Sequence, residues 1–263
     1  GRADRIGLNF TEVGTGVRAS VTLYNRGHTA VAHMRPGEVD WKRIFGQRGV
    51  RWFHTGGIFT ALSDSCTEVV REAMQAARAG GAVVSYDLNF RSKLWSAARA
   101  REVTGGLLPL IDVLIGNEED FEKVLGFSAE GADEHLKTLP VDGYKAMVRR
   151  VVAAHPHLRA VGTTLREVVS GLVNNWSAIM YIDGSFYESR KYEGMEVEDR
   201  VGGGDGFCSG FIYGLLHGME PQVCVDLGAA HGALLQTTRG DTSMVTMEEV
   251  QHVMKGGSAR IRR

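Results

Sequence analysis

The chain has 263 residues, 43% of them hydrophobic, and its 30 lysine and arginine residues almost balance 31 aspartate and glutamate residues. A nucleic-acid binder usually has a basic excess or a basic stripe, and a membrane span needs roughly 18 apolar residues in a row, so neither partner is expected. Three widely spaced cysteines among apolar residues favour neither a disulfide framework nor a zinc site, and a reducing cytoplasm is the expected compartment.

The first part of the chain is predicted to be rich in β-structure. Residues 17–25 alternate partly and contain β-branched side chains, which indicates a strand. Residues 29–34 are predicted to be its partner strand across a short turn. Pro36 and Gly37 interrupt this pattern, and residues 38–47 are expected to be helical. This β-rich segment is therefore predicted to be a small addition to the rest of the fold.

From residue 51 onward, predicted strands and helices alternate. The strands are expected at 51–55, 82–90, 112–117 and 158–164, and the helices at 65–81, 97–108, 118–127 and 144–154. A hairpin around Asp183-Gly184 is expected within 177–194, a loose loop at 126–140, and further helices at 205–217, 220–237 and 247–255. This alternation predicts an α/β fold with a mainly parallel sheet.

Glycine is unusually common, at 34 residues, against an average share of about 7%. We expect these glycines in tight turns or where a ligand approaches the backbone. The densest group is Gly202, Gly203 and Gly204, followed by Asp205 and an apolar helix. A helix start offers unpaired N–H groups and about half a positive charge, so this pattern predicts an anion site.

A carboxylate inside an anion site needs a chemical task. For Asp205 we expect it to be the acceptance of a proton from a hydroxyl group that attacks a phosphorus atom. The alternative is a glycine-rich turn that Asp205 merely caps. The chain contains neither a P-loop nor, at this place, a dinucleotide fingerprint.

Three other polar groups lie near the ends of predicted strands. If the strand continues through these residues, its alternation places Asp87, Asn89 and Arg91 on one side of the strand end, which suits a binding crevice. The alternative is that Asp87 and Arg91 form an internal ion pair. Residues 117–120 begin a helix and either handle phosphate and Mg²⁺ or complement the helix dipole. Residues 24–26 either contact a substrate or are solvated residues at a strand end.

The stretch 199–207, DRVGGGDGF, resembles the signature D-x-x-G-[AG]-G-D-x-F of the ribokinase-like (pfkB) carbohydrate kinases. The D-x-N-x-R pattern at 87–91, followed by Lys93-Leu94-Trp95, resembles the 2-keto-3-deoxygluconate kinase branch, as do residues 7–26, 163–168 and 228–244. The resemblance covers nearly the whole chain. It implies a three-layer α/β sandwich, with residues 1–37 mainly a small β lid and residues 38–263 a nucleotide- and sugar-binding core.

The resemblance also implies an activity, the ATP-dependent phosphorylation of the 6-hydroxyl of 2-keto-3-deoxygluconate with ATP and Mg²⁺. It assigns Asp205 as catalytic base, Gly202, Gly203 and Gly204 as the anion hole, and Tyr24, Arg26 and Arg91 as holding the sugar acid. Asn117, Glu119 and Asp120 would handle phosphate and metal, and Asn9, Asp87 and Asn89 are further candidates. An arginine pair suits a substrate that carries a carboxylate. The lid would also be the contact of a homo-oligomer.

This chain departs from the family pattern in four places. Asp120 stands where the family has Glu, with Glu119 beside it, and Gly206 stands where Ser or Ala is usual. Asn9 occupies the position of a substrate tyrosine in some relatives. Relatives also begin with a strand and a glycine-rich sugar motif well before the segment that starts at Gly7. We therefore expect that this N-terminal part is missing, and that residues 1–263 alone are inactive or poorly folded.

Two alternatives to this kinase stay open from the sequence. One is a fructokinase or another sugar kinase of the ribokinase family. The other is a sugar-binding remnant without phosphoryl transfer.

Overall fold

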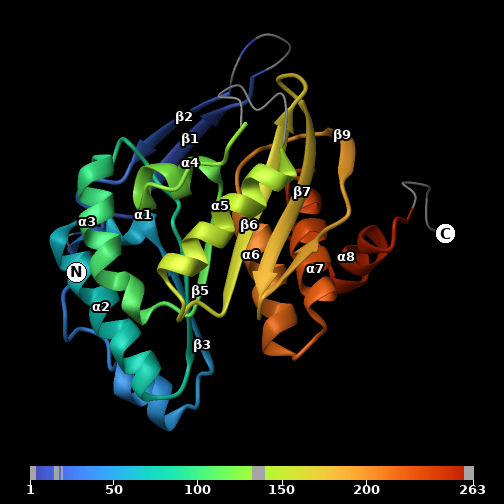
Figure 1. Ribbon diagram of the computed structural model, residues 1–263. Helices are drawn as coiled ribbons and strands as arrows, with labels where there is room; N and C mark the ends of the chain where they lie inside the picture. Colours follow the sequence, from blue (N-terminus) through green and yellow to red (C-terminus); the bar gives the residue numbers. More distant parts are fainter. Residues whose placement is uncertain (1–3, 15–17, 19, 132–139, 258–263) are drawn as a thin grey trace. The chain divides into compact units, whose positions relative to one another are not determined.

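The computed structural model describes residues 4–14, 18, 20–131 and 140–257 (Figure 1). The chain divides into two compact units, each taken by itself below. The first unit comprises Gly1–Glu12, Val21–Glu130 and Asp142–Val161, and the second comprises Val13–Ser20, Gly131–Val141 and Gly162–Arg263.

Strands and helices alternate along most of the chain, as predicted. The strands are β1 Leu8–Glu12, β2 Val21–Asn25, β3 Trp52–Gly56, β4 Val83–Asp87, β5 Val113–Gly116, β6 Ala160–Val168, β7 Val173–Ile182, β8 Ser185–Glu188 and β9 Tyr192–Glu196. The longer helices are α2 Asp64–Ala79, α3 Ala97–Leu107, α5 Val141–Ala154, α6 Gly203–Leu216, α7 Pro221–Leu235 and α8 Met247–Met254. Short helical turns are α1 Gly57–Thr60, η1 Val31–His33, η2 Arg43–Gln47, η3 Leu108–Leu110, α4 Glu118–Asp120 and η4 Phe121–Leu125.

The first unit is built on parallel strands in the order β3, β4, β5. The middle strand reads Val-Val-Ser-Tyr-Asp and is buried along most of its length, as expected for a strand that is covered on both faces. Helix α2 packs on β3 and β4 and buries Val70 and Met74 among its apolar stripe. Its first turn is capped by the Ser63 hydroxyl, which accepts the Cys66 N–H. The predicted parallel α/β arrangement is confirmed.

The predicted partner of β2 is wrong. Residues 31–33 form a 3₁₀ turn rather than a strand, and β2 pairs antiparallel with β1, with Phe10 opposite Leu23. The turn forms because the Thr29 hydroxyl accepts the Ala32 N–H at 3.3 Å, which curls the backbone back on itself.

The second unit carries the predicted hairpin. Strands β7 and β8 pair antiparallel around Asp183 and Gly184, whose φ angles are +48° and +89°, as the mirror-image two-residue turn requires. Strand β6 continues from the first unit into the second and neighbours β7, and β9 pairs with β7. Helices α6 and α7 lie side by side in this unit (Figure 1).

The helix pair α6 and α7 explains part of the glycine excess. Gly206, Gly210 and Gly214 recur every four residues on α6, so they lie on one face. A Cβ added at Gly210 would lie 2.6 Å from the Leu227 carbonyl oxygen, and one at Gly206 would lie 3.0 Å from the Cα of Gly232. We call this contact the glycine seam. It is a third use of glycine, besides turns and ligand approach, that the composition alone does not predict.

We expect Gly210→Ala to destabilise the protein by about 1–3 kcal/mol, because the added methyl group forces the two helices apart. The matched control is Gly105→Ala on α3, where an added Cβ meets nothing within 4 Å and the higher helix propensity of alanine contributes up to about 1 kcal/mol. Denaturant unfolding measures both changes. Equal stability of Gly210→Ala and the parent would contradict the seam.

The rest of the described chain adds two observations. Cys66, Cys208 and Cys224 are not joined in disulfides, and all three are buried. Among the residues that the structure describes, no helix has the length and apolar character needed to cross a membrane.

Candidate functional site

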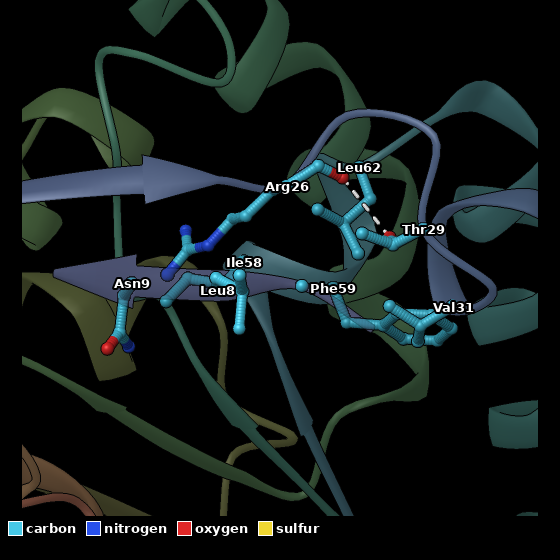
Figure 2. A pocket seen from close by; sticks show the side chains of 9 residues that line it. Leu8, Asn9, Arg26, Thr29, Val31, Ile58, Phe59 and Leu62 are labelled. Atoms are coloured by element: carbon cyan, nitrogen blue, oxygen red, sulfur yellow. Dashed lines mark hydrogen bonds between the residues drawn. The ribbon is translucent and has the colours of Figure 1, made fainter. Parts of the chain in front are cut away.

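A pocket of about 380 Å³ lies in the first unit, between β1, the loop after β2 and α1 (Figure 2). Two of the predicted substrate residues, Asn9 and Arg26, line it. Figure 2 shows their polar ends on the same side of the pocket. The remaining lining residues are mostly apolar and comprise Gly7, Leu8, Thr29, Val31, Ile58, Phe59 and Leu62. An apolar pocket with a few convergent polar groups is the usual form of a small-molecule site.

Arg26 brings a positive charge to this pocket. Its guanidinium carbon lies 4.0 Å from the centre of the Tyr24 ring, a cation–π contact that fixes its plane. Burial lowers the pKa of Arg26, and the charge of Arg91 lowers it further. The structure therefore brings the three predicted substrate residues into one neighbourhood, where two guanidinium groups would attract an anion.

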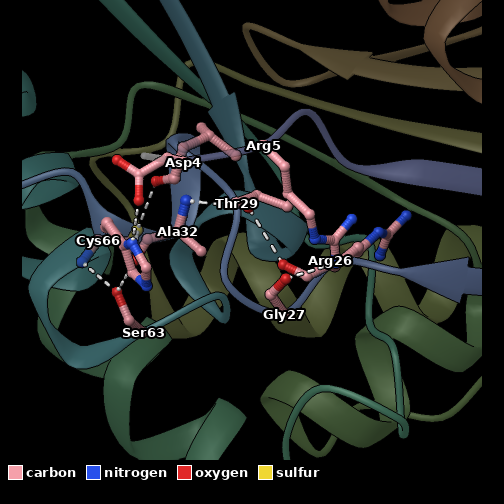
Figure 3. Close-up of polar contacts among 10 residues, drawn as sticks. Asp4, Arg5, Arg26, Gly27, Thr29, Ala32, Ser63 and Cys66 are labelled. Atoms are coloured by element: carbon pink, nitrogen blue, oxygen red, sulfur yellow. Dashed lines mark hydrogen bonds and ion pairs between the residues drawn. The ribbon is translucent and has the colours of Figure 1, made fainter. Parts of the chain in front are cut away.

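The loop that carries Arg26 is held by the hydrogen bonds shown in Figure 3. The Arg5 guanidinium donates to the Gly27 carbonyl, and the Thr29 hydroxyl donates to the Arg26 carbonyl at 3.1 Å. Further along, the Ser63 hydroxyl at the start of α2 donates to the Ala32 carbonyl at 2.9 Å. The position of Arg26 is thus fixed by its backbone neighbours as well as by Tyr24.

The loop after β4 differs from the prediction. The strand ends at Asp87, so alternation along a strand does not place Asn89 and Arg91. Instead, Asn89 has a left-handed φ of +37°, and its amide donates to the Asp87 carboxylate at 3.3 Å. Arg91 donates to the Phe90 carbonyl at 2.7 Å. Asp87 and Asn89 do meet, but because of a backbone turn.

Asp120 has a structural role in this region. Its carboxylate accepts the N–H of Asn117 at 3.0 Å and the N–H of Phe90 at 2.7 Å, and the Asn117 side chain accepts the N–H of Asp120 in return. This capping box ties the start of α4 to the loop after β4, which carries Arg91. Burial raises the pKa of Asp120 to about 6.

The raised pKa of Asp120 makes a testable contribution to stability. Between its ordinary pKa of 3.8 and about 6, the folded chain holds a proton on Asp120 that the unfolded chain has released. Asp120 therefore stabilises the fold fully below pH 3.8, and this contribution is lost as the pH rises through about 6.

We expect the free energy of unfolding of the parent, measured relative to Asp120→Asn, to fall between pH 4 and pH 6.5. Denaturant unfolding of both proteins at four pH values across this range gives the difference between their free energies of unfolding. Groups that titrate alike in the two proteins cancel from this difference. Asp64→Asn, at a side chain that is 92% exposed, serves as the control and should give a smaller change. A difference for Asp120→Asn that stays constant with pH would refute the assignment.

The second unit holds the predicted glycine turn. Gly202 has a left-handed φ of +85° and precedes α6, and no side chain caps the helix start. Its conformation is fixed by Asp199, whose carboxylate accepts the N–H groups of Val201 at 3.0 Å and Gly240 at 3.2 Å. The turn therefore lies at the positive end of the α6 helix dipole.

The three glycines of this turn serve different purposes. A Cβ at Gly202 would lie 2.9 Å from Leu235, and one at Gly203 would lie 3.0 Å from Gln236, whereas a Cβ at Gly204 would meet nothing within 4 Å. Space is therefore open over Gly204, next to the exposed Asp205. An anion can reach this helix start, and a carboxylate stands beside it.

Whether this region could bind Mg²⁺ depends on its acidic side chains. Among the residues that the structure describes, no group of three or more His, Cys, Asp and Glu side chains is placed to hold a metal ion. Both oxygens of Asp120 already accept backbone N–H groups, while Glu119 is exposed. Glu119 is therefore the accessible carboxylate of the two, and a magnesium ion bound there would keep most of its water, as Mg²⁺ commonly does.

The sequence matches the family model of the pfkB family carbohydrate kinases over residues 3–153 and 176–247. The chain belongs to this family. It is 31% identical over 259 residues to a 2-dehydro-3-deoxygalactonokinase of Haloferax volcanii, which covers 98% of this chain and 73% of that protein. A 2-dehydro-3-deoxygluconokinase of Thermoproteus tenax is 27% identical, over 89% of this chain and 63% of that protein.

The fold is similar to that of solved pfkB structures. The crystal structure of a 2-dehydro-3-deoxygluconokinase from Thermotoga maritima superposes with a TM-score of 0.89 and 36% sequence identity, covering 96% of this chain and 74% of that chain. The predicted ribokinase-like α/β fold and the predicted membership of a sugar kinase family are therefore confirmed.

Sequence reasoning missed the apolar side of the pocket in this pfkB kinase. Ile58 and Phe59 come from α1, which follows β3 after Gly56 and Gly57. A Cβ at Gly57 would lie only 2.1 Å from the Leu88 carbonyl oxygen, so the chain can turn there only with glycine. Two glycines directly after a predicted strand were the available signal for this part of the site.

Proposed function

We propose that this pfkB kinase phosphorylates a six-carbon keto-sugar acid, and that it transfers the γ-phosphoryl group of ATP to the 6-hydroxyl of 2-keto-3-deoxygluconate. The observation that carries the proposal is Arg26 in the lining of a mostly apolar pocket, with the charge of Arg91 acting on it. Two guanidinium groups can each donate two parallel hydrogen bonds to a carboxylate, and a neutral sugar offers no such partner. The names of the relatives agree with a sugar acid as substrate.

In the proposed reaction, Asp205 accepts the proton of the attacking hydroxyl as the oxygen–phosphorus bond forms. The N–H groups at Gly202, Gly203 and Gly204 stabilise negative charge on the phosphoryl oxygens. When bound, Mg²⁺ would neutralise phosphate charge, with Asn117 and Glu119 nearest to its water shell. Arg26 and Arg91 hold the carboxylate of the acceptor, and Asn9 faces its hydroxyl groups.

Residues 1–37 are proposed to be mainly a small β lid, and their two-stranded sheet β1–β2 is proposed to be an oligomer contact as well. One face of this sheet carries Leu8, Phe10, Val21 and Leu23, which are 50–61% exposed. The other face carries Asn9 and Tyr24. A two-stranded sheet cannot bury both faces alone, so a second copy of the chain is the expected cover for the apolar face.

We expect the combined substitution Phe10→Glu and Leu23→Glu to convert a dimer to a monomer, because charge replaces the apolar centre of the contact. Light scattering after size exclusion measures the mass of each species. The control is Thr11→Glu and Thr22→Glu on the opposite face, which should leave the dimer intact. A parent protein that is monomeric at high concentration would disprove the contact.

Turnover with ATP across a panel of sugars tests the proposed function. We expect 2-keto-3-deoxygluconate to be used better than fructose, since only the acid can engage both arginines. The galactonate epimer is a second candidate, favoured by the 31% identity to the Haloferax volcanii enzyme. Equal use of fructose and the acids would favour a fructokinase, and sugar binding without turnover would favour a non-catalytic remnant.

A further inference from the structure

Two arginines of the second unit, to which the sequence analysis assigned no role, influence one another through their charges. Arg166 belongs to β6, and Arg200 lies two residues before the glycine turn at Gly202. Burial lowers the pKa of Arg200, and the charge of Arg166 lowers it further. Like charges repel, so an anion between them would be stabilising.

No carboxylate within the described part of the chain pairs with either arginine. The neighbouring Glu167 binds Lys191 at 3.0 Å and the Asn175 amide at 2.6 Å. The carboxylate of Asp199, next to Arg200, accepts backbone N–H groups instead. The acidic residues nearest in sequence are thus engaged elsewhere.

The same neighbourhood contains buried donors without an acceptor. These are Nε of Arg166, Nε of Arg200 and the side-chain nitrogen of Asn174, and Asn174 is fully buried. Buried polar groups in native proteins are almost always hydrogen-bonded, so an unpaired group needs an explanation. Three such donors beside two uncompensated charges indicate a bound ligand that is anionic and rich in oxygen atoms.

Arg200 is also held in a fixed orientation. Its Nη2 atom donates to the carbonyls of Ser170 at 3.1 Å and Gly171 at 2.9 Å, and to the Asn174 side-chain oxygen at 3.3 Å. These bonds fix the guanidinium plane before any ligand arrives. A pre-oriented guanidinium loses less conformational freedom when it binds an anion.

We propose that Arg166 and Arg200, with the Asn174 amide, bind the phosphate chain of the nucleotide that supplies the phosphoryl group. The inference rests on the proposed kinase function. Phosphate is favoured over carboxylate because a polyphosphate carries several charges and many acceptor oxygens, enough for two guanidinium groups and an amide. Arg200 also leads directly into the glycine turn, whose N–H groups suit the same kind of anion.

The test uses the full chain and sodium tripolyphosphate as the probe, because this anion lacks both base and sugar. We expect Arg166→Gln to weaken tripolyphosphate binding by about 10- to 100-fold in calorimetry, as loss of a charge-assisted hydrogen bond implies. Arg200→Lys, which keeps the charge but not the fork, should weaken binding less than Arg200→Gln. The control Lys191→Gln removes one positive charge that is already paired, and should bind like the parent.

Thermal unfolding gives a readout that a merely structural role would not produce. Without ligand, Arg166→Gln should melt no lower than the parent, because like-charge repulsion is relieved, while the rise of Tm with tripolyphosphate should be lost. A lower Tm without ligand together with unchanged tripolyphosphate binding would assign Arg166 to the fold and overturn the proposal. A parent that does not bind tripolyphosphate would also overturn it.

Kinetics separates this inference from the proposed function. If the parent phosphorylates a sugar acid and Arg166→Gln leaves KM for ATP unchanged, the phosphate site is refuted and the kinase stands. If the parent binds tripolyphosphate in an Arg166-dependent way but phosphorylates no sugar, the site stands and the proposed function fails. We expect a KM for ATP raised at least 10-fold in Arg166→Gln, in proportion to the weaker binding.

Discussion

Replacing Asp205 with asparagine is expected to lower kcat by about 10²- to 10⁴-fold, the usual effect of removing a general base. Asparagine keeps the shape of the side chain at the exposed start of α6 but cannot accept the proton of the attacking hydroxyl. Sugar affinity should change much less, because Asp205 is proposed to act mainly in the transition state. Steady-state turnover and equilibrium sugar binding together measure both effects.

The matched control is Asp183→Asn in the same unit. Asp183 lies at the β7–β8 turn with a left-handed φ of +48°, a conformation that asparagine also tolerates. The chemical change is identical and the kinase activity should stay at the parent level. If Asp205→Asn turned over at the parent rate, the role of Asp205 as base would be wrong and its carboxylate would only complete the helix start.

The second large effect is expected at Arg26, which lines the pocket, and at Arg91, whose charge acts on Arg26. Arg26→Gln and Arg91→Gln should each lower kcat/KM for 2-keto-3-deoxygluconate by about 10²-fold, because a buried site that loses its partner discriminates strongly. Use of fructose should change little, since fructose has no carboxylate to hold. The gap between acid and neutral sugars should therefore narrow in both variants.

Arg101→Gln provides the comparison for this pair. Arg101 is an exposed arginine of the same unit that donates to the carbonyls of Glu122 and Lys123, away from the pocket residues. Its substitution should leave the preference for the acid intact. An equal fall in the use of acid and fructose by Arg26→Gln would mean that Arg26 shapes the pocket without recognising the carboxylate.

Much of the α/β core could be predicted from the sequence because its signals are local. The stretch Val83–Asp87 carries two β-branched valines and a tyrosine, which favour a strand, and Asp183-Gly184 has a strongly preferred turn conformation. Helix α2 shows both a serine cap and a glycine stop. Each of these features depends on residues that are neighbours along the chain.

The features that sequence reasoning missed depend on contacts between distant residues. Residues 29–34 have the composition of a strand, but the Thr29 hydroxyl closes a turn and β1 takes the place beside β2. Asp120 accepts the N–H of Phe90, which lies 30 positions earlier, and the sequence carries no signal for this contact. Arg166 and Arg200 are 34 positions apart, and the sequence carries no signal that the charge of one acts on the other.

The pocket of the first unit was also only partly predictable from the sequence. The candidate polar residues Arg26, Arg91 and Asp205 are named from motifs, while the pocket wall of Ile58 and Phe59 follows only from the turn after β3. Apolar residues at a helix start carry no chemical signature. Packing alone decides whether they form a core or the wall of a pocket.

The glycine seam between α6 and α7 has a consequence for ligand binding. With backbone against backbone at Gly206 and Gly210, α6 has no side-chain layer through which it could slide or rotate. The N–H dipoles at its start are therefore aimed in advance, and binding an anion there should need little reorganisation energy. Loosening the seam should penalise ligand affinity through entropy, even though no residue of the seam touches the ligand.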